Sequence, residues 1–205
     1  MERKSIHETR FGRIFQDAEL SAGYAKRHTA SARRAGRQFA GFLNRQQRTP
    51  ERVLDIGSGS GDTLLALAEH FPDAQLVGAD LCQPLLDISR QRAAERGQTN
   101  RVRFENASAT ELPFDDAHFD AVFSQDTLHM VDDPVRMLNE CARVLKPGGV
   151  ALVRVIRRSW LLSCLEGVFR TGFTRHEVAG MVAQSAFEQF KVSSGLLRIA
   201  AEGHR

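Results

Sequence analysis

The sequence predicts an α/β fold in which a mostly parallel sheet is covered by helices on both faces. From residue 52 onward, short apolar runs typical of strands alternate with stretches of helical periodicity. This alternation supplies the crossover connections that parallel strands need. A glycine-rich turn at residues 57–61 directly follows the first apolar run. The composition, with 42% hydrophobic and 26% charged residues, is that of an ordinary globular domain.

Residues 1–50 are predicted to form a helical cap before a core at residues 51–205, all within a single domain. The cap has an apolar face at helical spacing, formed by Ala35, Phe39, Phe42 and Leu43. Residues 1–48 hold 11 Lys and Arg against four Asp and Glu, whereas the rest of the chain is mildly acidic. Such a segment is either a solvated helix face or a surface that attracts an anionic substrate or nucleic acid.

Five strands separated by helices are predicted between residues 52 and 156. The strands are expected at residues 53–56, 76–79, 101–105, 119–123 and 150–156, with a turn at 146–149 and a fully apolar last strand. Pro72 stops the first of the helices between them, Pro84 opens the second and Gly97 closes it. A third helix is expected at residues 134–145.

The last fifty residues depart from this alternation. A connector at about residues 157–173 precedes a capped helix at residues 174–185. Two strand-like segments then follow at residues 187–192 and 196–201, separated by a short turn that ends in Gly195.

The residues that could carry chemistry fall at strand ends, where open α/β sheets bind ligands. Gly57, Gly59 and Gly61 form a turn whose backbone can approach a ligand closely. A dinucleotide fingerprint needs a glycine where this chain has Asp62, and the Lys-Ser or Lys-Thr ending of a phosphate-binding loop is missing. Asp55 adds a second acidic group just before the turn. An acidic loop fits a cationic ligand with an amino group, such as S-adenosylmethionine, which carries both a sulfonium and an ammonium.

Asp80 follows the second predicted strand, 19 residues after Gly61. A carboxylate at this position can accept hydrogen bonds from both hydroxyls of a ribose. Taken alone, Asp80 is equally well explained as a turn or helix-cap residue. With the glycine turn before it, the ribose interpretation is favoured.

Five motifs in register resemble the class I S-adenosylmethionine-dependent methyltransferases. In order along residues 52–156 they are Val53–Gly61, Val77–Asp80, Glu111–Phe114, Phe119–Asp120 and Arg143–Gly149. Together they are similar to the methyltransferase type 11 branch, which includes ubiquinone/menaquinone C-methyltransferase-like proteins. The resemblance implies a Rossmann-like, seven-stranded sheet in the order 3-2-1-4-5-7-6, with strand 7 antiparallel.

The resemblance also implies that the chain binds S-adenosylmethionine and releases S-adenosylhomocysteine. The methionine half of the cofactor would be held by Asp55, partly through water, and by the turn residues Gly57, Ser58, Gly59 and Gly61.

The nucleoside half would be held by residues at the ends of the next strands. Asp80 would bind the ribose and Leu81 would pack on the adenine. Ser108, with the Ala109 backbone as a substitute, stands where the family commonly has an Asp that contacts the adenine amino group. Gln125 would line the methionine or sulfonium side.

His129 is the candidate general base. Residues 128–132 resemble the Leu-His-His-Val-Pro-Asp stretch that borders the acceptor in this family, although Met130 replaces the second His. A histidine titrates near neutrality, which suits a base. The alternative role for His129 is that of a hydrogen-bonded structural histidine. Asp126 is a further candidate, as a base or as a residue that orients the acceptor.

Aromatic residues at two places are candidates for contact with the ligands. Tyr24 is the only tyrosine and could touch the cofactor carboxylate or the acceptor; ordinary packing is the alternative. A covering of the acceptor pocket, or part of the core, is expected from Trp160, Leu161, Leu162 and Phe169.

The cysteines predict neither a disulfide framework nor a metal site, because Cys82, Cys141 and Cys164 are odd in number and widely spaced. Cys82 lies near a helix start, where a thiol pKa is lowered. Cys141 is expected to face the core. We assign no catalytic thiol and no metal.

The leading functional prediction is a methyltransferase that transfers a methyl group to a small-molecule acceptor by in-line displacement. The alternatives are an RNA methyltransferase that uses the basic segment, and a noncatalytic S-adenosylmethionine-binding regulatory or partner subunit. Nucleic acid is not expected as a partner, because the motifs of nucleic-acid amino and pyrimidine-C5 methylation are missing. A cytoplasmic location without a membrane span is expected, and a homodimer is left open.

Overall fold

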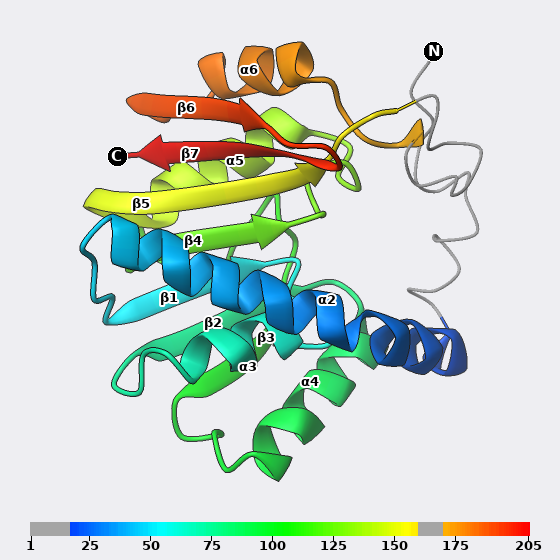
Figure 1. Cartoon of the computed structure of the whole chain (residues 1–205). Helices are drawn as coiled ribbons and strands as arrows, with labels where there is room; N and C mark the ends of the chain where they lie inside the picture. Colours follow the sequence, from blue (N-terminus) through cyan, green and yellow to red (C-terminus); the bar gives the residue numbers. More distant parts are fainter. Residues whose placement is uncertain (1–16, 160–169) are drawn as a thin grey trace.

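The computed structural model describes residues 17–159 and 170–205, and its centre is a seven-stranded sheet (Figure 1). The strands lie in the order β3-β2-β1-β4-β5-β7-β6. They are β1 Arg52–Ile56, β2 Gln75–Asp80, β3 Val102–Asn106, β4 Phe119–Gln125, β5 Leu145–Ile156, β6 Gln189–Ser194 and β7 Arg198–His204. Strand β7 pairs antiparallel with β5 and β6, and the other pairs are parallel. The order and direction predicted from the resemblance are thereby confirmed.

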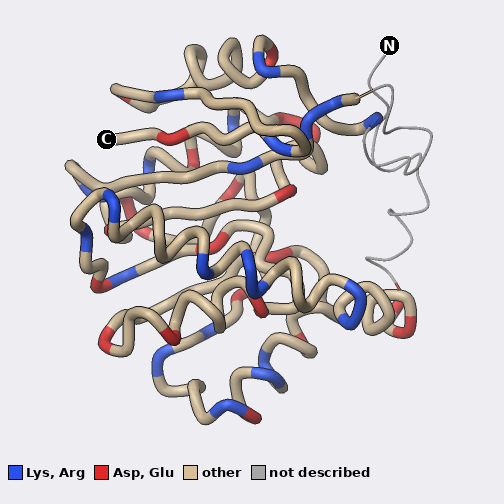
Figure 2. The backbone as a smooth tube through the Cα atoms, viewed as in Figure 1, with Lys and Arg blue, Asp and Glu red and all other residues tan. Residues whose placement is uncertain are grey.

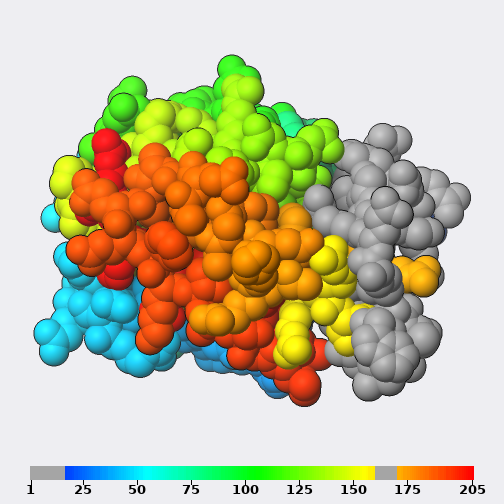
Figure 3. Space-filling view, turned by 90° about the horizontal axis from the view of Figure 1, so that it is seen from above, coloured from blue at the N-terminus to red at the C-terminus, as the bar shows by residue number. Residues whose placement is uncertain are grey.

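Helices cover both faces of this sheet and enclose two cores. The helices are α2 Ala18–Arg45, α3 Asp62–Ala68, α4 Gln83–Glu95, α5 Pro134–Val144 and α6 Arg175–Ala183. One core packs residues of α2, α3 and α4 against β1 to β5, and the other packs α5 and α6 against the opposite side. In the view from above, the C-terminal region in orange and red forms an outer face of the molecule (Figure 3).

Helix α2 lies over the middle of one face of the sheet, near β1 and β4, and extends beyond the edge of the sheet (Figure 1). It begins where the Asp17 side chain accepts a hydrogen bond from Leu20 N at 2.9 Å, a favourable N-cap. The predicted apolar face is buried, and Phe39 stacks on Phe123 of β4 with ring centroids 4.4 Å apart. At Gly36 the helix meets α3 so closely that a Cβ would overlap the Thr63 carbonyl oxygen.

Strand β5 differs from its prediction in two respects. It begins at Leu145 rather than at residue 150, because the predicted turn at 146–149 lies within the strand, where the register with β4 shifts. It is also not fully apolar, since Arg154 lies half-buried within it.

The C-terminal elements match their predictions closely. Helix α6 has a capping box in which Thr174 and Glu177 each accept a hydrogen bond from the other's backbone.

Lys and Arg residues are spread along α2 and α4 on one side of the molecule (Figure 2). Among the helices of the described residues, none has the length and apolar character needed to cross a bilayer.

Candidate functional site

The glycine turn links β1 to α3 at the carboxyl edge of the sheet. Gly57, Gly59 and Gly61 all have positive φ, of 75°, 51° and 75°. A Cβ on Gly57 would overlap the Thr127 side chain, so only glycine fits there. At Gly59, by contrast, a Cβ would meet nothing closer than Leu85 at 3.9 Å. The turn is therefore closely packed at Gly57 and open at Gly59, so its backbone can approach a ligand at Gly59. The turn at residues 57–61, together with Asp55 and Asp80, is called the cradle below.

Asp80 lies at the end of β2 and faces this turn. One carboxylate oxygen accepts from Gly59 N and the other from Cys82 N, both at 2.8 Å. Burial raises the pKa of Asp80, and these backbone N–H groups oppose that effect. Each carboxylate oxygen has a second lone pair, so Asp80 can still accept from two hydroxyl groups.

Asp55, on β1, is the second acidic residue of the cradle. It is buried, and burial together with the charge of Asp80 raises its pKa to about 7. The carboxyl is therefore near half-protonation at neutral pH. A cation brought beside Asp55 and Asp80 would favour the charged form of both.

Asp62 does not contribute acidity to the cradle, and this corrects the sequence interpretation. Its side chain is 1% exposed and pairs with three arginines. Arg33 of α2 lies 3.6 Å from Asp62, Arg92 comes from α4, and Arg96, the C-cap residue of α4, lies 3.3 Å away. Asp62 therefore joins the start of α3 to the two neighbouring helices. Among the residues that the structure describes, Asp55 and Asp80 give the cradle its negative charge.

The residues predicted around the adenine lie at the ends of β2 and β3. Leu81 is 66% exposed beside Asp80, so its apolar surface is accessible. The Ser108 hydroxyl accepts from Thr110 N at 3.2 Å and lies 2.9 Å from the Thr110 hydroxyl, while Ala109 packs partly against the core. The loop is held near Asp80, because Ala107 N donates to the Asp80 carbonyl at 3.1 Å.

Two buried polar atoms near the cradle have no hydrogen-bond partner within the described residues: Ser58 Oγ and Gln125 Oε1. The Ser58 side chain lies against Gly78 of β2. Gln125 ends β4, the strand beside β1. A buried acceptor without a donor costs free energy, so Gln125 is suited to receive a ligand N–H or O–H.

His129 and Asp126 follow β4. The His129 side chain is 2% exposed, in a turn where Met130 N donates to the Thr127 carbonyl at 2.7 Å. Asp126 has a positive φ of 58°, an uncommon conformation for a residue other than glycine. Its carboxylate accepts three hydrogen bonds from Arg198 of β7, at 2.6 to 3.0 Å. Asp126 is thus an anchor for Arg198, which leaves it less suited to act as a base.

Tyr24, Arg154 and Arg198 surround the same end of β4. Burial and the charges of Asp126 and Asp80 raise the pKa of Tyr24 to about 12. Sequence reasoning missed both arginines. Arg154 carried a signal, since a charged residue interrupts an otherwise apolar strand, but Arg198 in β7 carried none.

The cysteine prediction was wrong for Cys82 and right for Cys141. Burial raises the pKa of the Cys82 thiol instead of lowering it. Cys141 is fully buried on α5. The predicted covering residues Trp160, Leu161, Leu162 and Phe169, together with Cys164, lie outside the described residues.

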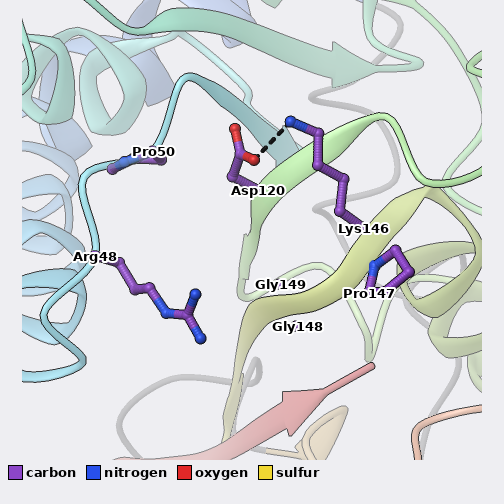
Figure 4. A pocket seen from close by; sticks show the side chains of 7 residues that line it. All are labelled: Arg48, Pro50, Asp120, Lys146, Pro147, Gly148 and Gly149. Atoms are coloured by element: carbon purple, nitrogen blue, oxygen red, sulfur yellow. Dashed lines mark hydrogen bonds and ion pairs between the residues drawn. The ribbon is translucent and has the colours of Figure 1, made fainter.

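A small cavity of about 100 Å³ lies at the opposite, amino edge of the sheet (Figure 4). Asp120 forms an ion pair there with Lys146 at 2.6 Å and accepts from Glu51 N and Arg52 N at 3.0 and 2.7 Å. Arg48 and Pro50 line the same cavity. Asp120, part of a sequence motif, thus ties the start of β1 to β4 and β5, far from the glycine turn.

Residues 54–153 match the family model described as a methyltransferase domain. Over 107 residues the chain is 43% identical to a demethylmenaquinone methyltransferase of Thermus thermophilus, covering 52% of this chain and 48% of that protein. It is 36% identical over 112 residues to the 27-O-demethylrifamycin SV methyltransferase of Amycolatopsis mediterranei, covering 55% and 40%. The aligned part thus spans less than half the length of these curated relatives.

Solved structures share the fold. A SAM-dependent methyltransferase from Aquifex aeolicus superposes with a TM-score of 0.67 at 17% identity, covering 80% of this chain and 88% of that one. Family and fold together imply S-adenosylmethionine as the cofactor. The residues fit that group, because the cradle is open at Gly59, carries two carboxylates for a cation and has the free acceptor atom of Gln125.

Proposed function

Because residues 54–153 match the family model described as a methyltransferase domain, we propose that the chain is an S-adenosylmethionine-dependent methyltransferase that acts on a small molecule. The observation that carries this proposal is the open glycine turn facing Asp80, with Gly59 N donating to the carboxylate at 2.8 Å. The two relatives are named for small-molecule acceptors, a demethylmenaquinone and a demethylrifamycin. The same matches lend no support to RNA methylation or to a noncatalytic partner subunit.

Each half of the cofactor would have its own residues. Asp55 and the turn at residues 57–61 would hold the methionine half, and Asp80 would accept from the ribose hydroxyls. Leu81 would cover one adenine face, with Ser108 and Ala109 at its amino group. The free carbonyl oxygen of Gln125 would face the sulfonium or ammonium.

When bound, S-adenosylmethionine supplies an electrophilic methyl group on a sulfonium. The chain's own part is to position the acceptor and to exclude water. Holding the attacking atom about 3–3.5 Å from the methyl carbon lowers the barrier by several kcal/mol. His129 would accept a proton where the acceptor must lose one during attack.

The test is calorimetric titration of the chain with S-adenosylhomocysteine. We expect one-to-one binding to the wild type and a loss of about 100-fold in affinity for Asp80→Ala, since hydrogen bonds to charged groups contribute about 1.5–3 kcal/mol each. Asp120→Ala, at the opposite edge of the sheet, is the matched control and should bind as the wild type does. No binding to the wild type at millimolar ligand would refute the proposal.

A further inference from the structure

Two arginines and one aspartate meet under α2 at the carboxyl ends of β4 and β5. Asp126 N donates to the carbonyl of Arg154 at 2.8 Å. Arg154 pairs with Ala200 of β7, two residues from Arg198, so both arginine side chains lie on the same face of the sheet. Arg154 donates to Gln38 of α2, which identifies this face as the one that α2 covers.

This group of side chains holds two positive charges, on Arg154 and Arg198, but only one negative charge, on Asp126. Asp126 directs both of its carboxylate oxygens to Arg198. Within residues 17–159 and 170–205, no carboxylate forms an ion pair with Arg154. Burial, and then the charge of Arg198, lower the pKa of Arg154. Two half-buried guanidinium groups that share one carboxylate would be stabilised by an added anion.

Two uncharged groups beside the arginines can complete a polar site. Tyr24 lies near both Asp80 and Asp126, whose charges contribute to its raised pKa. Its hydroxyl therefore stays protonated at neutral pH and can donate a hydrogen bond. Gln125, whose register partner on β5 is Arg154, can present its amide NH2 group to a carboxylate once the side-chain amide is flipped.

We propose that Arg154 and Arg198 form a binding site for a carboxylate, with Asp126 as the residue that positions Arg198. Arginine suits this ligand because its planar fork can donate two parallel hydrogen bonds to one carboxylate. The inference rests on the proposed function, which places the cofactor beside the same strand ends.

Two molecules could bring the carboxylate: the methyl acceptor, or the amino-acid end of the cofactor. Of the cofactor residues, Asp55 and Asp80 lie on β1 and β2 and only Gln125 lies on β4, whereas the arginines lie on β5 and β7. This separation favours the acceptor. A carboxylate-bearing acceptor would distinguish this chain from its relative named for the quinone demethylmenaquinone.

The first experiment titrates the chain, saturated with S-adenosylhomocysteine, with benzoate, phenylacetate and cinnamate and with their neutral amides. At least one acid should bind about tenfold or more tightly than its amide, since charge-assisted bonds are roughly twice as strong as neutral ones. Arg154→Gln should abolish that preference. So should the double variant Asp126→Asn, Arg198→Gln, which leaves no buried carboxylate unpaired. Arg103→Gln, an exposed arginine of β3, is the control and should retain it.

The second experiment identifies the source. S-adenosylhomocysteine is compared with its decarboxylated analogue in wild type and Arg154→Gln. A preference for the carboxylated form that Arg154→Gln removes would assign the site to the cofactor. If Arg154→Gln alters neither this preference nor that for the acids, the proposal is overturned. Should the wild type bind no S-adenosylhomocysteine, the proposed function fails, and the arginine site is judged by the acids and amides on the free chain.

Discussion

The two ends of strand β4 carry the same chemistry for different purposes. At the amino end, Asp120 pairs with Lys146 and two backbone N–H groups, and these bonds link adjacent strands. At the carboxyl end, Asp126 pairs with Arg198, but Arg154 and the Gln125 carbonyl oxygen are left over. An ion pair alone therefore does not identify a site. Around β4, the polar groups that remain unmatched after internal pairing distinguish the carboxyl end of the strand from its amino end.

Asp62 offers the largest test of this comparison, because it lies at the carboxyl edge but is fully matched. Asp62→Asn should lower the free energy of unfolding by about 3 kcal/mol, since it leaves three arginines around a neutral group. Urea denaturation measures this change. Asp87→Asn, which removes an exposed partner of Arg90, should change it by less than about 0.5 kcal/mol. Similar small effects for both variants would mean that Asp62 is not structural.

The two ends of β4 can be compared directly through Asp120→Asn and Asp126→Asn. Asp120→Asn should cost about 1–2 kcal/mol in unfolding free energy, because it weakens three hydrogen bonds between strands. Asp126→Asn should cost less than about 1 kcal/mol, since asparagine tolerates positive φ and the ion pair is partly exposed.

Ligand binding should reverse this order. Asp126→Asn removes the charge that positions Arg198 and should weaken the binding of carboxylate probes, whereas Asp120→Asn should leave it unchanged. Stronger probe binding by Asp126→Asn would instead indicate that Asp126 competes with the ligand for Arg198 and does not position it.

Alanine variants of two glycines distinguish the effect of backbone strain on stability from the effect of blocking the ligand site. Gly59 and Gly97 both have positive φ, of 51° and 62°, and both have space for a Cβ. Alanine at either position should cost about 1–2 kcal/mol in stability. Only Gly59→Ala should also weaken S-adenosylhomocysteine binding, by about tenfold, because its methyl group stands in the open cradle. Equal affinities for the two variants in calorimetry would contradict this placement of the ligand.

The smallest effect concerns protons. The folded-state pKa of Asp55, about 7, lies above its usual value of 3.8. Its contribution to stability is therefore fully present below pH 3.8 and is lost as pH rises through about 7. A cationic ligand favours the carboxylate, so its binding at neutral pH should release protons from Asp55.

Calorimetry in buffers of different ionisation enthalpy measures this release. Asp55→Asn should remove it, together with the matching part of the pH dependence of thermal unfolding. Unchanged proton release in that variant would assign the proton to another group.

The sequence predicted those parts of the molecule that local pattern decides. The strands and the glycine turn with Asp80 followed from patterns whose residues are near one another in the chain, whereas the strand order followed from the resemblance to the methyltransferase family. The role of Asp62 could not be predicted, because its partners come from two other helices, 29 to 34 residues away. Arg198 was missed for the same reason, since it meets Asp126 only through the antiparallel β7. The early start of β5 depends on a register shift with β4 that composition does not record.

Because α2 contacts α3 closely at Gly36, a small tilt of α2 about this contact would displace residues near the start of the helix. About 18 Å of rigid helix separate Gly36 from Tyr24, at 1.5 Å per residue. A tilt of only about 5° around the contact with Thr63 would swing the tyrosine by about 1.5 Å, and a misplacement of about 1 Å can cost a hundredfold in rate. The absence of a Cβ at Gly36 thus fixes the angle of α2 and, through it, the position of the Tyr24 side chain.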